Sequence, residues 1–170
     1  MRLKDFDYRS RGAYFVTVTI QERTPLLGSL DDATGGVHLN DAGEMINHWW
    51  LELPQKFQAV ILDASTVMPN HFHGILLIGC GVTEVSQEER VSLSTAIQWF
   101  KSMTTTEYFR GVQEGRWRRV ERRLWQRGFY DHIIRTDRDL VEIREYIEKN
   151  PGALFERSAG RTHRYSGADT

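Results

Sequence analysis

The sequence has 170 residues, of which 40% are hydrophobic and 26% are charged, and its net charge is −1 at neutral pH. These values are typical of one globular domain and exclude a fibrous or wholly disordered chain. The single cysteine, Cys80, excludes an internal disulfide and a zinc site built from several thiolates. No apolar run is long enough to cross a bilayer, and the N-terminus does not resemble a signal peptide. We therefore expect a soluble cytoplasmic protein without a membrane partner, with one domain over residues 1–155 and a polar tail over 156–170.

The first half of the chain predicts a strand, a helix and a hairpin. Residues 14–20 are β-branched and aromatic, as in a strand, and a loop rich in Gly and Asp follows. Asp41, with a glutamate three positions later, resembles a capping box, and apolar residues then recur at helical spacing. A second strand is expected over 57–68 and a third over 71–78, joined by the turn at Pro69-Asn70.

The second half predicts a polar linker over 79–90, then two helices with a strand between them. Apolar residues at 93, 96, 97, 100 and 103 mark the first of these helices, and the threonines at 104–106 are expected to bend or end it. A fourth strand is expected over 129–135. Thr136 and Asp139 can cap a last helix, which is expected to stop at Asn150-Pro151.

The expected order is therefore β-α-β-β-α-β-α. The tight hairpin in the middle requires antiparallel neighbours, which excludes a doubly wound parallel sheet. The fold class predicted is α+β, a ferredoxin-like (split βαβ) antiparallel sheet with helices and an additional C-terminal helix.

His71 and His73 are the most specific local feature. On a strand, residues two apart point to the same face, roughly 6.5–7 Å apart along the chain. Both imidazoles can therefore converge on one metal ion, whereas Phe72 would point into the core. The alternative is that they are two polar residues at a strand start, because a convincing metal site needs a third protein ligand.

Tyr146 and Asn150 lie four residues apart, so they stack on one face of the last helix. Taken alone, Tyr146 is a packing tyrosine and Asn150 a helix-end residue. Joined to the histidine pair, two imidazoles and an amide oxygen would hold a divalent ion, Mg²⁺ or Mn²⁺, with Zn²⁺ not excluded. Tyr146 could then attack a phosphate bound to that ion and form a phosphotyrosine.

Several segments occur here in the order found in a known family. They are residues 67–74 (VMPNHFHG), 100–102 (FKS), 124–135 (LWQRGFYDHIIR), 146–147 (YI) and 150–151 (NP). Together they resemble the REP-associated tyrosine transposases, which belong with the single-tyrosine insertion-sequence transposases and, more broadly, with the HUH single-strand nucleases. The resemblance covers about residues 8–155.

This resemblance implies a metal-dependent enzyme. It implies that His71 and His73 bind the metal, that Tyr146 is the nucleophile, and that Asn150, where related transposases often have Gln, is the third ligand. It also implies cleavage of single-stranded DNA at palindromic hairpin ends, which leaves a 5′-phosphotyrosine and a free 3′-OH. The segment at 152–155 departs from the family because it lacks the usual basic and Trp residues.

The arginines are concentrated in one segment that this resemblance would place on DNA. Residues 86–170 carry a net charge of +3, against −4 for residues 1–85, and 18 of the 22 basic residues are arginines. Arginine clamps phosphates, and tryptophan stacks on unpaired bases. The expected DNA-binding residues are Arg116, Trp117, Arg118, Arg119, Arg122, Arg123 and Arg127. The alternative is a solvated charged loop, and Trp125 is expected to belong to the core.

Other interpretations stay open at this point. A ferredoxin-like sheet can bind nucleic acid without chemistry, and the site could also be a zinc hydrolase acting on another substrate. Tyr130 is the second candidate for the nucleophile, and His132 is either part of the site's surroundings or core. The sequence does not distinguish a monomer from a homodimer.

Overall fold

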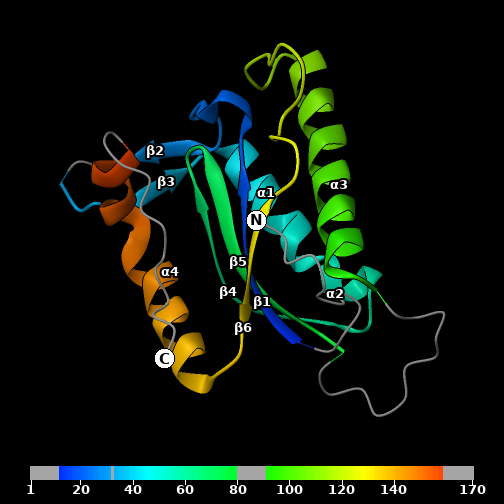
Figure 1. Cartoon of the computed structure of the whole chain (residues 1–170). Helices are drawn as coiled ribbons and strands as arrows, with labels where there is room; N and C mark the ends of the chain where they lie inside the picture. The colour runs from blue at the N-terminus through cyan, green and yellow to red at the C-terminus, as the bar shows by residue number, and fades with distance from the viewer. Residues whose placement is uncertain (1–11, 32, 80–90, 159–170) are drawn as a thin grey trace.

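A computed structural model describes residues 12–31, 33–79 and 91–158, with side chains up to residue 149 in the last helix. Its centre is a four-stranded antiparallel sheet with helices on both faces (Figure 1). The main elements are β1 (Gly12–Thr19), α1 (Asp41–Leu51), β4 (Val60–Met68), β5 (His71–Ile78), α3 (Leu93–Gln113), β6 (Tyr130–Ile134) and α4 (Asp137–Ser158). The smaller ones are a 3-10 turn η1 (Gln21–Arg23), β2 (Gly28–Leu30), β3 (Val37–Leu39) and α2 (Leu53–Lys56). Most of the expected linker and tail lies outside the described residues.

The strand order is β4-β5-β1-β6, and all neighbouring strands are antiparallel. With the helices between them, this order confirms the predicted ferredoxin-like arrangement. The sequence did not predict the small hairpin β2-β3, where a loop was expected. Its strands have three residues each, too few for an alternating pattern. Gly28 is required there because a Cβ would lie 2.3 Å from the carbonyl oxygen of His38.

The helix expected at Asp41 begins there, but the cap is one residue earlier. The Asn40 side chain accepts a hydrogen bond from the Gly43 N–H at 3.0 Å and donates one to the Leu26 carbonyl. Asp41 is thus the first helical residue, where its negative charge favours the helix N-terminus. The expected capping box is wrong, because the N-cap is Asn40 and Asp41 is already helical.

The threonine run at 104–106 neither bends nor ends α3, which continues to Gln113. Thr104 and Thr106 donate their hydroxyl hydrogen bonds to the carbonyls of Phe100 and Ser102. Hydroxyls that bond to the preceding turn remain compatible with a helix, so the low helix propensity of threonine is overridden here.

The last helix also extends further than expected. Thr136 caps it as predicted, by accepting a hydrogen bond from the Asp139 N–H at 3.1 Å. However, α4 runs through Asn150-Pro151 to Ser158, so the expected end at Pro151 is wrong. A proline removes only one intrahelical hydrogen bond, and the turns on either side can continue the helix.

The two faces of the sheet bury different cores. On one face, Phe72 packs against Trp50 of α1 and Phe100 of α3, and all three are fully buried. The opposite face is covered by α4 (Figure 1). Its smaller cluster consists of Phe15, Ile75, Ile134, Ile143 and Ile147.

Candidate functional site

His71 and His73 lie on the face of the sheet that α4 covers. They flank Phe72, which is fully buried on the opposite side, as the alternation of a strand requires. Their Nε2 atoms are 3.0 Å apart and their ring centroids 4.6 Å apart. The expected convergence of the two imidazoles is confirmed.

Hydrogen bonds from outside the pair orient both rings. Nδ1 of His71 lies 2.6 Å from Oδ1 of Asn70, whose amide nitrogen donates to the Arg23 carbonyl. Nδ1 of His73 lies 2.8 Å from the hydroxyl of Thr17, its partner on β1. With its proton on Nδ1, each ring turns the lone pair of Nε2 toward the other histidine. Such partners fix the tautomer and orientation of metal-binding histidines in general.

Burial keeps both histidines neutral. Burial, together with the charge of Arg23, lowers the pKa of His71 to about 4. Burial, and then the neighbouring His71, holds the pKa of His73 well below its usual range. Neutral imidazole is the form that binds a metal. The 3.0 Å between the two Nε2 atoms is spanned either by one imidazole proton, in an N–H···N hydrogen bond, or by a cation that both lone pairs bind, so this donor pair fits a divalent ion.

The histidines alone do not complete a metal site. Among the residues that the structure describes, no group of three or more His, Cys, Asp or Glu side chains is placed to hold an ion. Within the described residues, a third protein ligand would therefore be of another type. Asn150 was expected in this role, but its side chain lies outside the described part of the structure.

Tyr146 lies next to this pair. Its ring meets the ring of His73 edge to face, with 5.6 Å between centroids, and it also contacts Phe15 at 6.0 Å. The side chain is half-buried, at the border between the apolar contact of α4 with the sheet and the two histidines. Tyr146 therefore packs between the last helix and the sheet, as the sequence indicates for this residue taken alone, and it also contacts His73.

Two polar links hold α4 against the sheet. Arg144, two residues before Tyr146, donates two hydrogen bonds to the Asp63 carboxylate on β4, one of them at 2.8 Å. His132 on β6 lies 3.0 Å from Oδ2 of Asp139 in the first turn of α4. The ambiguous His132 therefore connects the strand to the helix that carries Tyr146.

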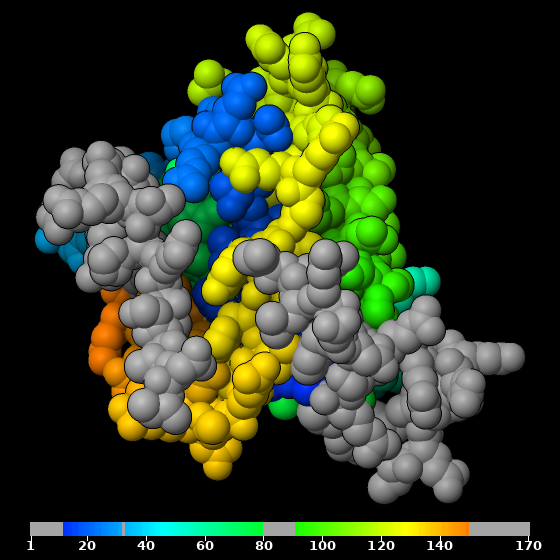
Figure 2. Space-filling model, in the orientation of Figure 1, coloured from blue at the N-terminus to red at the C-terminus, as the bar shows by residue number. Residues whose placement is uncertain are grey.

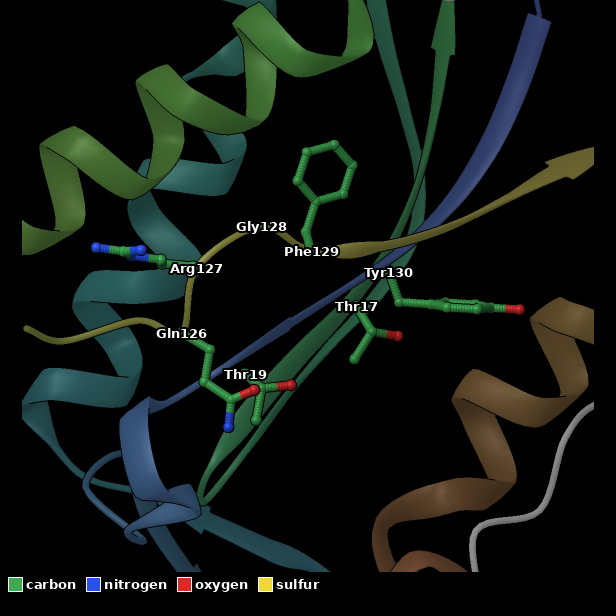
Figure 3. A pocket seen from close by; sticks show the side chains of 7 residues that line it. All are labelled: Thr17, Thr19, Gln126, Arg127, Gly128, Phe129 and Tyr130. Carbon is green, nitrogen blue, oxygen red and sulfur yellow. The ribbon is translucent and has the colours of Figure 1, made fainter. Parts of the chain in front are cut away.

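Tyr130, the alternative nucleophile, is placed further from the pair. It stands opposite Thr17 in the pairing of β1 with β6, and Thr17 in turn stands opposite His73. Tyr130 is therefore separated from His73 by one strand. Its side chain is 46% exposed, and it points toward α4 (Figure 3).

The arginine-rich segment connects α3 to β6 along the surface. It lies in the upper right of the face in Figure 2, in lime to yellow. Arg118, Arg119, Arg122, Arg123 and Arg127 are exposed. Arg116 is also exposed but pairs with Glu114. The segment thus presents several positive charges to solvent.

The two tryptophans of this segment pack inward. Trp125 is 3% exposed and donates a hydrogen bond to the Thr104 hydroxyl at 2.9 Å, so the expectation that it belongs to the core is confirmed. Trp117 stacks on Tyr108, and the guanidinium of Arg116 covers its ring at 4.7 Å. These contacts leave Trp117 half-buried, and its expected stacking on bases stays a prediction.

Sequence reasoning missed Thr17, Asn70 and the pair Asp63–Arg144. Asn70 adjoins the histidines, so its capacity to orient His71 was a usable signal. Thr17 lies 56 residues from His73, and Arg144 lies 81 residues from Asp63. Only the strand register and the docking of α4 bring these groups together.

None of the helices in the described ranges is both long and apolar enough to cross a membrane.

A family model for IS200-like transposases matches residues 38–150. An uncharacterised protein of Haemophilus influenzae is 32% identical over 160 residues, which cover 89% of this chain and 86% of that protein. A second protein of that organism, assigned as a REP-associated tyrosine transposase, is 26% identical over 148 residues, or 85% and 73% of the two chains.

Two solved structures share the fold. One is a REP-associated tyrosine transposase bound to a REP hairpin, with a TM-score of 0.58 and 21% identity over 89% of this chain and 73% of that chain. The other is a protein of Deinococcus radiodurans assigned as a transposase, with a TM-score of 0.51 and 13% identity over 88% and 96%.

Proposed function

The chain belongs to the IS200-like transposase family, and from this premise we propose that it is a metal-dependent transesterase that cuts single-stranded DNA with Tyr146 as its nucleophile. The observation that carries the proposal is the contact between the rings of Tyr146 and His73. It brings a phenol, which can form a phosphate ester, next to a pair of neutral, oriented imidazoles.

His71 and His73 would hold a divalent ion, Mg²⁺ or Mn²⁺, with Asn150 as the third ligand. When bound, this ion would neutralise the phosphate and polarise its P–O bonds. Asn70 and Thr17 would keep the two Nε2 lone pairs directed at it.

The covalent step exchanges one phosphate ester for another. The Tyr146 oxygen loses its proton and forms a bond to phosphorus, the bond from phosphorus to the 3′ oxygen breaks, and that oxygen takes up a proton. The products are a 5′-phosphotyrosine and a free 3′-OH. Because the new bond is again a phosphodiester, a 3′-OH can reverse the step and rejoin strands without ATP.

The substrate that we propose is a DNA hairpin with single-stranded flanks. A relative with the same fold is described in complex with a REP hairpin. The exposed arginines at 118, 119, 122, 123 and 127 would contact the phosphates of such a hairpin. Trp117 would support this segment from within, through its packing on Tyr108.

Covalent capture tests this function. The protein is incubated with 5′- and 3′-labelled single-stranded hairpins and Mg²⁺ or Mn²⁺, and the products are separated on a denaturing gel. We expect the 3′ fragment to migrate with the protein, and we expect EDTA to prevent this. Tyr146→Phe removes one oxygen and should abolish the adduct while DNA binding persists.

Tyr130→Phe is the matched control, because it removes the same oxygen from the alternative nucleophile. It should still form the adduct. An adduct with Tyr146→Phe but not with Tyr130→Phe would assign the reaction to Tyr130. DNA binding without any adduct would identify a binding module, and metal-dependent hydrolysis without an adduct would identify a hydrolase.

A further inference from the structure

A hollow beside the histidine pair has no role in the chemistry above. Its volume is about 270 Å³, and it is lined by Thr17, Thr19 and the segment 126–130 (Figure 3). Small-molecule pockets typically have about 300–1,000 Å³, so this one is of a size for a small planar group. It shares a wall with the proposed active site, because the Thr17 hydroxyl is also the partner of His73.

The outer wall of the hollow is held in place from two sides. Lys101 of α3 donates hydrogen bonds to the carbonyls of Gln126 and Gly128, at 2.7 and 2.8 Å. The Gln126 N–H donates to the Thr19 carbonyl at 2.9 Å. Gly128 has a φ of +70°, a conformation that strains other residues. A wall fixed in this way loses little conformational entropy when a ligand binds.

The groups around the hollow are polar but mostly uncharged. Thr17, Thr19 and Gln126 offer two hydroxyls and an amide, which donate and accept hydrogen bonds. The side chain of Arg127 points away from the threonines (Figure 3). Tyr130 lines the hollow beside Thr17, its side chain is directed toward α4, and nearly half of it is exposed (Figure 3). Neutral donors and acceptors beside an aromatic ring suit an unpaired nucleobase better than a phosphate.

The hollow lies close to the place where the reacting phosphate is expected, beside the histidine pair. In the sheet, Tyr130 stands opposite Thr17, and Thr17 stands opposite His73. Neighbouring strands lie about 4.7–4.9 Å apart, so the hollow lies within the reach of one nucleotide from the histidine pair. We propose that it holds one unpaired base of the DNA strand next to the phosphate that Tyr146 attacks, a proposal that rests on the function proposed above.

Equilibrium binding tests this without cleavage. In the Tyr146→Phe protein, affinity is measured for a hairpin with a single-stranded flank in which one position at a time is abasic. One flank position should lose about 5- to 150-fold in affinity, the range for removal of a stacked base. In a double variant that carries Tyr146→Phe and Tyr130→Ala, an abasic site at that position should reduce affinity little further, because the ring that stacks on the base is already missing. Tyr130→Phe keeps the ring, so the abasic site should reduce affinity as much as it does in the Tyr146→Phe protein.

Gln126→Ala provides a second readout, since it should reduce the preference among the four bases at that flank position and at no other. If every abasic loss is unchanged in Tyr130→Ala, or if no position depends on Gln126, the hollow is not a nucleotide site. If one flank position depends on Tyr130 and Gln126 but the wild-type protein forms no covalent adduct, the proposed chemistry is disproved and the nucleotide site is retained. If the wild-type protein forms the adduct but no flank position depends on Tyr130 and Gln126, the nucleotide site is disproved and the proposed chemistry is retained.

Discussion

The two faces of the central sheet are built from the same four strands, but they differ in what lies on them. On β5, Phe72 enters the core beneath α1 and α3, while His71 and His73 emerge on the face of α4. The face beneath α1 and α3 is apolar. The face beneath α4 is apolar along only part of its length, and the remainder carries the polar site. One strand thus serves stability on one side and the proposed chemistry on the other.

The α4 face changes character along the strands. Phe15 and Ile134 lie beneath Ile143 and Ile147 of α4, whereas Thr17, Thr19 and the two histidines occupy the other end. Tyr146 stands at the boundary. The apolar end can therefore hold the helix that delivers the proposed nucleophile to the polar end.

The largest effect is expected from His71→Ala. Loss of a ligand should remove the stabilisation of phosphate charge, which is worth several kcal/mol, so the rate of covalent capture should fall at least about 1,000-fold. The urea unfolding free energy should change by no more than about 1 kcal/mol, since the histidine lies at a strand end. Capture at the normal rate would show that the polar end is not catalytic.

Phe72→Ala should give the opposite result, although the two residues are adjacent. Its ring packs against Trp50 and Phe100, with centroids 4.6 and 5.3 Å away, so truncation should cost about 3–5 kcal/mol. Urea unfolding monitored by circular dichroism measures this loss. A cost below about 1 kcal/mol would mean that the face beneath α1 and α3 is not the main source of stability.

The difference between the faces also explains what could be predicted from the sequence. The strand 14–20, the His-Phe-His alternation and the apolar periodicity that begins at Ala42 are local patterns, and each predicted an element that the structure contains, although the helix ends at Leu51 and Leu53 begins the separate α2. The order of elements then restricts the sheet to few topologies. The face beneath α1 and α3 was predictable because burial leaves a periodic signal.

The polar face was predictable only in part. The convergence of His71 and His73 follows from strand geometry alone. The hydroxyl of Thr17 and the anchoring of Arg144 by Asp63 depend on contacts between distant segments, which leave no local pattern. The packing of Trp117 on Tyr108 is another such contact, and its neighbouring arginines gave no sign of it.

The exposed arginines between α3 and β6 are expected to contact phosphates, and the salt dependence of DNA binding tests this. Arg118, Arg119, Arg122 and Arg123 are replaced together by alanine. For single-stranded DNA, each lost contact should reduce the slope of log K against log salt by about 0.7, and affinity near 0.15 M salt should fall about 100-fold. Arg138→Ala on α4 is the control, and its slope should match the wild type. An unchanged slope in the fourfold variant would identify a merely solvated loop.

The smallest effect on stability and on the rate of covalent capture is expected from a change in the ion pair that links α4 to β4. Asp63 lies at an irregularity of β4, between Leu62 and Ser65, and there it meets Arg144. Asp63→Asn should lower the unfolding free energy by only about 0.5–1 kcal/mol, as for a partly exposed ion pair. Because Arg144 precedes Tyr146 by two residues, the rate of covalent capture should fall further, by about 10-fold, through misplacement of the phenol.

Glu142→Gln is the matched control, since it breaks an ion pair with Arg138 within α4 that does not reach the sheet. It should leave the capture rate unchanged.

The dependence of stability on pH provides an independent check of the Asp63–Arg144 pair. The hydrogen bonds from Arg144 hold the pKa of Asp63 below its usual value of 3.8. A carboxyl whose pKa is lowered by folding stabilises the protein above the unfolded pKa, and this contribution disappears as the pH falls through the folded pKa. The difference in urea midpoint between wild type and Asp63→Asn should therefore be constant from pH 7 to pH 5 and shrink below about pH 4. A difference that is undiminished at pH 2–3 would mean that the asparagine disturbs β4 itself and that the ion pair does not hold the helix.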